Sequence, residues 1–337
     1  MNVRHANFTR VSRSLARLRR GDGPPLLLCI DIEPDPRLVE REHPAPWRGF
    51  ERFVAELPNL RDRLEAVGAR APRFTWFLRM DPQIADTWGS AAWVNDEYGE
   101  ALRALQEQGD ELGLHTHTWR WEDTAGAWVA DREDPEWIEH CMTMALDAFE
   151  ASFGRRCRAH RGGDRQLSPE MLSVLVARGV EVDLTVEPGL PPAGALAPEE
   201  HARGTTPDYR EAPTQPYRFG SASDFLSPDP RGGAPLMIPL LAAPDGNGGR
   251  APLYLWTEPA TFASRLDALL AQASPLALAF GIRTDLPLIP EWDWFIENLE
   301  CLAAHPSLRR SRFVTASEAA ADLQQMTNET ARAGAGA

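Results

Sequence analysis

Short apolar runs alternate with segments of helical periodicity along most of this chain. Residues 26–32 form the first apolar run, and over 49–67 apolar residues recur at helical spacing until Gly68 ends the pattern. The same two patterns predict strands over 73–78, 111–117, 157–161, 180–184, 235–239 and 276–282, helices over 98–108, 135–153, 168–178, 261–272 and 292–305, and a last strand and helix within 312–323. Strands and helices that alternate in this way indicate a parallel sheet with crossover helices.

The fold class that this pattern favours is α/β, with a single barrel domain over residues 24–325. Polar motifs follow several predicted strands, which favours a (β/α) barrel over an open sheet, because barrel enzymes carry their sites at that end. Around the barrel we expect a basic arm over residues 1–23, a loop-rich insert at about 187–251 and a disordered tail over 326–337. Ser168 is the predicted N-cap of its helix.

The composition excludes several classes of function. A formal net charge of −14 disfavours binding to nucleic acid. The basic residues are all arginine, which removes lysine Schiff-base chemistry and the anchoring of pyridoxal phosphate. The four cysteines form no CxxC pair, so a structural zinc site is not expected. No apolar run reaches the roughly 18 residues of a membrane span, and without a signal-peptide core we expect a cytoplasmic protein.

Two strand ends carry the most informative polar groups. Asp31 and Glu33 follow the first strand, and His115 and His117 follow a later one. Side chains two apart on a strand share a face, so each pair points the same way. Two acids and two imidazoles at neighbouring strand ends are suited to a divalent metal, and a metal hydrolase is the first hypothesis. The structural alternatives are a helix-capping role for the acids and packing or hydrogen-bonding roles for the histidines.

The order of four motifs resembles that of the polysaccharide deacetylase family. The motifs are Asp-x-Glu at 31–33, Glu-Leu-Gly-Leu-His-Thr-His at 111–117, Arg-Gly-Gly-Asp at 161–164 and Gly-Val-Glu-Val-Asp ending at Asp183. This resemblance implies a distorted (β/α) barrel and metal-dependent removal of N-acetyl groups. A divergent member with these motifs would hold a divalent metal, expected to be Zn²⁺, that activates water and polarises the substrate carbonyl.

The resemblance also implies roles for individual residues. Asp31 matches the general base, and Glu33 falls where some members place a carboxylate metal ligand. His115 matches the first metal-binding histidine. Arg161 matches the arginine that orients the base, although a structural ion pair is the alternative. Asp183 matches the fourth-motif acid, with capping of the next turn as its alternative.

Two positions depart from the family pattern. The second metal-binding histidine is expected four residues after the first, where this chain has Trp119; His117 could replace it on the same strand face. Arg283 stands where a late histidine is expected to act as general acid. A guanidinium does not release its proton at working pH, so Arg283 could steady an oxyanion or bind a carboxylate but could not protonate an amine. His160 is the nearest spare acid, although it alternates with Arg161 and could point away.

Candidate substrate contacts come from aromatic and charged residues near these motifs. Trp119 and Trp121 could stack on a sugar ring, or simply pack in the core. Arg283 and Asp285 follow a late strand, and Arg79 and Asp81 follow the second strand. Both pairs are expected at the rim of the site.

Two functions stay open on the sequence. The first is hydrolysis of an amide bond in an N-acetylated sugar or a related small molecule. The second is a non-catalytic barrel that binds a partner, favoured by the missing acid histidine.

Overall fold

The computed structural model describes residues 23–335, apart from residues 37 and 247, and the backbone alone over 326–335. The expected basic arm therefore lies outside the described residues, except for Gly23. Among the described helices, none combines the length and the apolar character that a membrane span requires.

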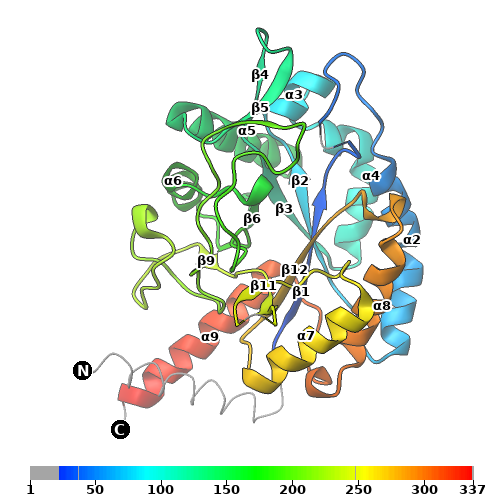
Figure 1. Ribbon diagram of the computed structural model, residues 1–337, viewed down its shortest axis with the longest axis vertical. Helices are drawn as coiled ribbons and strands as arrows, with labels where there is room; N and C mark the ends of the chain where they lie inside the picture. Colours follow the sequence, from blue (N-terminus) through cyan, green and yellow to red (C-terminus); the bar gives the residue numbers. More distant parts are fainter. Residues whose placement is uncertain (1–22, 37, 247, 336–337) are drawn as a thin grey trace.

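A seven-stranded parallel sheet forms the centre of the molecule (Figure 1). Its spatial order is β12 (Leu278–Arg283), β1 (Leu26–Ile32), β2 (Thr75–Arg79), β3 (Glu111–Thr116), β6 (Ala159–Gly162), β7 (Val182–Asp183) and β9 (Leu236–Met237). Because β12 pairs with β1, the last strand of the chain lies beside the first. The two edge strands approach each other after β9, where Leu241 N–H donates to Ala279 O at 2.8 Å. The sheet therefore curls into a distorted barrel, as the sequence predicts.

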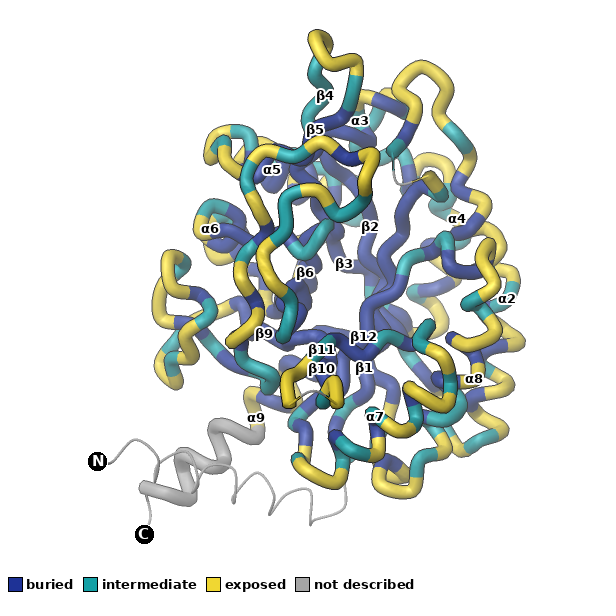
Figure 2. The backbone as a smooth tube through the Cα atoms, viewed as in Figure 1, coloured by how far each residue is buried: buried dark blue, intermediate teal, exposed yellow. Residues whose placement is uncertain are grey.

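Alternation along the strands separates two apolar layers. On β1, Leu26, Leu28 and Ile30 belong to the large outer core, whereas Leu27 and Cys29 belong to a smaller cluster inside the barrel. Parallel strands buried on both faces have no polar face to show, so each reads as a continuous apolar run. Figure 2 shows the strands of the seven-stranded sheet as buried, with exposed residues concentrated on the surrounding helices, loops and hairpins.

Helices surround the barrel. They are α2 (Arg48–Ala66), α3 (Pro82–Trp88), α4 (Trp93–Glu107), α5 (Pro135–Phe153), α6 (Pro169–Arg178), α7 (Pro259–Gln272), α8 (Trp292–Ala304) and α9 (Ala316–Ala335). The predicted cap is confirmed, because Ser168 Oγ accepts from Met171 N–H at 3.3 Å at the start of α6. Residues 316, 319, 320 and 323 of α9 belong to the cluster inside the barrel.

Several elements differ from the sequence prediction. α4 begins five residues earlier than expected, at Trp93, and has non-helical dihedrals at Tyr98, where we placed its start. The sequence reading also missed α3 and the antiparallel hairpin of β4 (Trp119–Glu122) and β5 (Ala127–Asp131). Both are too short to show a clear apolar period. The remaining short strands are β8 (His201–Arg203), β10 (Ala242–Pro244) and β11 (Arg250–Pro252).

The C-terminal segment is a second difference. We expected a disordered tail from residue 326, but the backbone of α9 continues as a helix to Ala335. The segment is rich in alanine, with glutamate and arginine, all of which favour a helix.

Candidate metal centre

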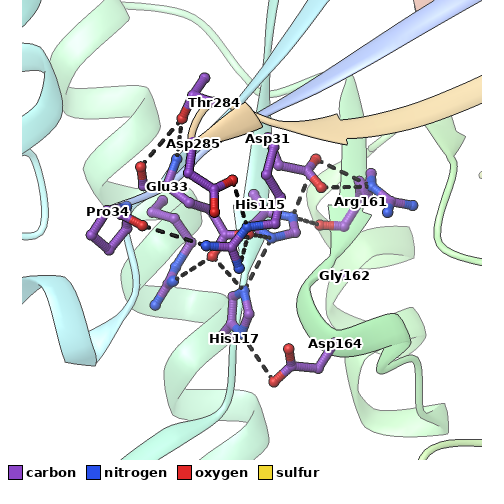
Figure 3. Close-up of polar contacts among 12 residues, drawn as sticks. Asp31, Glu33, Pro34, His115, His117, Arg161, Gly162, Asp164, Thr284 and Asp285 are labelled. Atoms are coloured by element: carbon purple, nitrogen blue, oxygen red, sulfur yellow. Dashed lines mark hydrogen bonds and ion pairs between the residues drawn. The ribbon is translucent and has the colours of Figure 1, made fainter. Parts of the chain in front are cut away.

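The carboxyl ends of the neighbouring strands β1, β2, β3 and β6 carry the site, and Figure 3 shows how Asp31, His115 and Arg161 lie there. On β1 the inward positions Leu27 and Cys29 are followed by Asp31, and on β2 Phe77 is followed by Arg79. His115 stands beside Arg79 on β2 and beside Arg161 on β6 in the strand register. The same alternation that fills the barrel with apolar side chains therefore places charged ones at its mouth.

Three donor atoms converge at this mouth. His115 Nε2 lies 3.4 Å from Glu33 Oε1, and His117 Nε2 lies 3.3 Å from Glu33 Oε2. The two Nε2 atoms are 3.0 Å apart. Glu33, His115 and His117 are all buried, and their ligand atoms lie within 4.8 Å of one another. The structure thus brings together all three residues predicted as metal ligands.

Hydrogen bonds to the ring Nδ1 atoms orient the two imidazoles. His115 Nδ1 is 2.8 Å from the carbonyl oxygen of Arg161, which can only accept, so this nitrogen carries the proton and Nε2 presents a lone pair. His117 Nδ1 has two neighbours: Trp119 Nε1–H donates to it at 2.8 Å, and Asp164 Oδ2 lies at 3.3 Å. A proton on Nδ1 would be donated to Asp164 and would leave Nε2 of His117 open to a cation.

Charges around the donors shift their pKa values. Burial raises the pKa of the Glu33 carboxyl, but Arg283 and the two histidines outweigh it and hold that pKa well below its usual value. Burial and Arg79 lower the pKa of His117, but the carboxylates of Asp164 and Glu33 outweigh them, so its pKa is raised. Glu33 is therefore an anion in this setting.

Asp31, the predicted base, belongs to a further set of polar contacts next to the three donors. Arg161 Nε donates to both carboxylate oxygens of Asp31, at 3.2 and 3.0 Å. Its Nη2 donates to Glu187 Oε1 at 3.2 Å, and Tyr254 O–H donates to Glu187 Oε2 at 3.0 Å. His115 Nδ1 lies 3.7 Å from Asp31 Oδ1, which joins the base to the metal ligands.

Ion pairs join these groups into one network, here called the site network. It contains six carboxylates (Asp31, Glu33, Asp81, Asp164, Glu187 and Asp285), four guanidiniums (Arg79, Arg132, Arg161 and Arg283) and the two imidazoles. With neutral imidazoles the network has an excess of two negative charges. Buried charge is costly unless it is compensated, and a divalent cation would compensate this excess.

The residues present fit a divalent cation. Two imidazole nitrogens and one carboxylate form the ligand set of many catalytic zinc sites, which keep further positions open. The backbone also leaves little room for His117 to move away: a Cβ at Gly163 would lie 2.1 Å from Cδ2 of the His117 ring and 2.3 Å from its Nε2. The imidazole is thus packed directly on the backbone of the loop that follows β6.

Asp183 does not join this arrangement. Val182 and Leu184 point into the barrel, so Asp183 points to the outer face. There His160 Nδ1 lies 2.7 Å from Asp183 Oδ2, and Thr185 N–H and O–H donate to the same carboxylate. His160 is fully buried on that outer face, so the spare acid candidate also points away from the three donors.

The predicted substrate contacts divide into two groups. Arg283 lies at the site, with Nη1 3.5 Å from Glu33 Oε1 and Nε donating to Asp285 at 3.1 Å. Trp119 is only 2% exposed and packs in a small apolar cluster beside His117. Trp121 lies on the same hairpin, where its indole donates to Asp123.

Sequence reasoning assigned no role to Arg132, Asp164 and Glu187 of the site network or to Tyr254, which donates to Glu187, and it misplaced a pair. Glu187 and Tyr254 lie in irregular segments, where no periodic pattern marks a side chain as inward. The pair Arg79 and Asp81, expected at the rim, is instead fully buried beneath Glu33. Their alternation with Phe77 on β2 could have indicated this depth.

Similarity to known proteins appears in solved structures only. No family model matches the sequence, and no curated protein matches it. A candidate glycoside hydrolase/deacetylase from Parabacteroides distasonis aligns with 88% of this chain and 70% of its own, at 14% identity and a TM-score of 0.55. A candidate polysaccharide deacetylase from Mycobacterium smegmatis aligns with 90% of this chain and 91% of its own, at 14% identity and a TM-score of 0.49. A family 4 carbohydrate esterase pseudoenzyme from Bacillus anthracis aligns with 88% of this chain and 66% of its own, at 8% identity and a TM-score of 0.42.

The Parabacteroides structure carries the argument for the fold. It confirms the predicted fold: the chain has a distorted barrel like that of this glycoside hydrolase/deacetylase, with which it shares 14% identity.

Proposed function

We propose that this chain is a metal-dependent hydrolase that cleaves a C–N (amide) bond. The convergence of Glu33, His115 and His117 on one point carries this proposal. The substrate we propose is an N-acetylated sugar or a related small molecule, and the metal is Zn²⁺, because imidazole and carboxylate ligands suit it.

The residues around the donors have distinct tasks in this reaction. A bound divalent cation would supply Lewis acidity, polarising the acyl carbonyl and making water more acidic. Asp31 accepts the proton of the attacking water, and Arg161 orients that carboxylate through its Nε–H. Arg283 presents a permanent cation beside Glu33, where it can stabilise a developing negative charge but cannot give a proton to the leaving amine.

The test is release of acetate or amine from a panel of N-acylated substrates. Purified protein loaded with zinc or cobalt should hydrolyse at least one of them, and Glu33→Ala should lose both bound metal and turnover. Asp31→Asn is the matched variant: it should keep the metal and lose about 10²- to 10⁴-fold in rate, since it removes only the base. Turnover that survives in Glu33→Ala would contradict the proposal.

A non-catalytic barrel is the second candidate. The observation that favours it is that Arg283 stands at the position of the expected acid histidine. The two histidines among the described members of the site network are both candidate metal ligands. Elemental analysis after gentle purification separates the two functions. A chain that retains no metal, and whose partner binding does not change in His115→Ala, would favour the binding role.

A further inference from the structure

Arg79 is a buried arginine beneath the three donors. It is 1% exposed and donates from three nitrogens. Its Nη1 donates to Glu33 Oε2 at 3.1 Å, and its Nη2 donates to Gln83 Oε1 at 2.7 Å. Nε and Nη2 also donate to the two oxygens of Asp81, at 2.5 and 3.1 Å. This fork of bonds fixes the guanidinium plane, as a bidentate arginine–carboxylate pair does.

Asp81 connects this arginine to a second donor. The backbone N–H of His117 donates to Asp81 Oδ2 at 3.1 Å. Asp81 Oδ1 also accepts from Gln83 N–H and thereby caps helix α3. A continuous path of hydrogen bonds therefore runs from the Glu33 carboxylate through Arg79 and Asp81 to the backbone of His117.

We propose that Arg79 and Asp81 act together as a positioning pair that holds Glu33 and His117 in place for a divalent cation. The inference rests on the proposed metal site and adds the residues that set its affinity. Groups behind the ligands orient them, and their loss typically weakens metal binding by about 10- to 100-fold.

The pair is built so that the orienting group does not repel the cation. A guanidinium next to Glu33 would by itself oppose a second positive charge there. Asp81, at 0% exposure, has its carboxylate directly against the same guanidinium and offsets that charge. Arg79 can then orient Glu33 at little electrostatic cost to the bound cation. This explains why an aspartate that does not contact Glu33 matters for the metal.

Asp81→Asn tests the inference with a small change in shape. Asparagine has one acceptor oxygen where aspartate has two, so it can accept from His117 N–H or cap α3 but not both, and it leaves the charge of Arg79 unbalanced. Zinc affinity, measured by chelator competition, should fall about 10- to 100-fold.

Asp110→Asn is the matched control. Asp110 is also buried, pairs with Arg61 and accepts from Phe74 N–H, but it lies before β3, at the opposite end of the barrel. Zinc affinity in this control should stay at the wild-type value.

A second variant reports geometry in place of charge. Arg79→Lys keeps the positive charge but cannot hold Glu33, Asp81 and Gln83 in one plane. The visible absorption of the cobalt-loaded protein should change in Arg79→Lys and stay unchanged in Asp110→Asn. Unchanged zinc affinity in folded Asp81→Asn, or an unchanged cobalt spectrum in Arg79→Lys, would overturn the positioning role. A wild-type chain that binds neither metal would instead overturn the metal site itself.

Discussion

At the scale of single residues, Gly163 leaves no room for a side chain beside the His117 ring. A Cβ at Gly163 would overlap the ring, which is buried and held by contacts with His115 Nε2 and Trp119 Nε1. We predict that Gly163→Ala displaces His117 and lowers zinc affinity at least about tenfold. Isothermal titration calorimetry with Zn²⁺ measures this directly.

Gly99→Ala provides the control for that substitution. Gly99 lies in helix α4, and a Cβ added there would have its nearest neighbours at 3.7 Å or more, which is ordinary contact. Alanine is favoured over glycine inside a helix by about 0.5–1 kcal/mol, so this variant should be slightly more stable and bind zinc like the wild type. Equal zinc affinity in the two variants would remove the steric argument for Gly163.

The two neighbours of His117 Nδ1 should have opposite effects on the metal. The Asp164 carboxylate, 3.3 Å from Nδ1, favours the ring form that carries its proton on Nδ1 and whose Nε2 can bind a cation. The indole of Trp119 donates to Nδ1 and favours the other form. We predict that Asp164→Asn weakens zinc binding and that Trp119→Phe strengthens it severalfold. Zinc titrations of both variants against the wild type decide the matter, and a loss of affinity in Trp119→Phe would refute the prediction.

At the scale of the elements, strand alternation explains which predictions from the sequence succeeded. Asp31 and His115 lie on β1 and β3, and Glu33 and His117 directly follow these strands; the spacing of two keeps each pair on one side. The parallel order of β1, β2 and β3 then brings the two pairs together. The sequence could therefore predict the barrel and the three donors from local pattern and motif order.

The same rule shows why other assignments could not be made from the sequence. β7 has only two residues, too few for its pattern to say which side faces inward, and Asp183 proved to face outward. Glu187 and Tyr254 come from irregular segments on either side of β9, so their approach to Arg161 depends on the completed barrel. Such long-range contacts leave no periodic mark in the sequence.

The outer position of Asp183 leads to a prediction at this scale. Its carboxylate joins β6 to β7 through His160, and it also holds Thr185, whose hydroxyl oxygen accepts from Gly162 N–H. Asp183→Asn should lower the free energy of unfolding by about 1–3 kcal/mol, because a buried hydrogen-bonded group loses its matched partner. Zinc affinity should stay unchanged. Chemical denaturation and zinc titration test both parts, and a stable variant with weakened zinc binding would restore Asp183 to the site.

At the scale of the whole molecule, the site network concentrates charge where the barrel is otherwise apolar. Its excess of two negative charges lies above the apolar cluster inside the barrel, in a chain that already has a net charge of −14. Folding brings these carboxylates together and removes most of them from water. A cation that binds the folded state alone should therefore stabilise the whole chain.

The last prediction follows from this coupling of binding and folding. At a free zinc concentration of about 100 times the dissociation constant, binding to the folded state alone adds about 2.7 kcal/mol to the free energy of unfolding. Thermal unfolding should therefore shift to higher temperature with zinc and return on addition of a chelator.

Glu33→Gln should abolish the zinc-dependent shift. Among the described metal ligands, Glu33 is the only carboxylate, and it lies close to the Nε2 atoms of both imidazoles. Asp110→Asn, which changes a buried carboxylate at the far end of the barrel, should lower the starting temperature yet keep the shift. If zinc raised the unfolding temperature of Glu33→Gln as much as that of the wild type, the stabilising cation would have to bind elsewhere on the molecule.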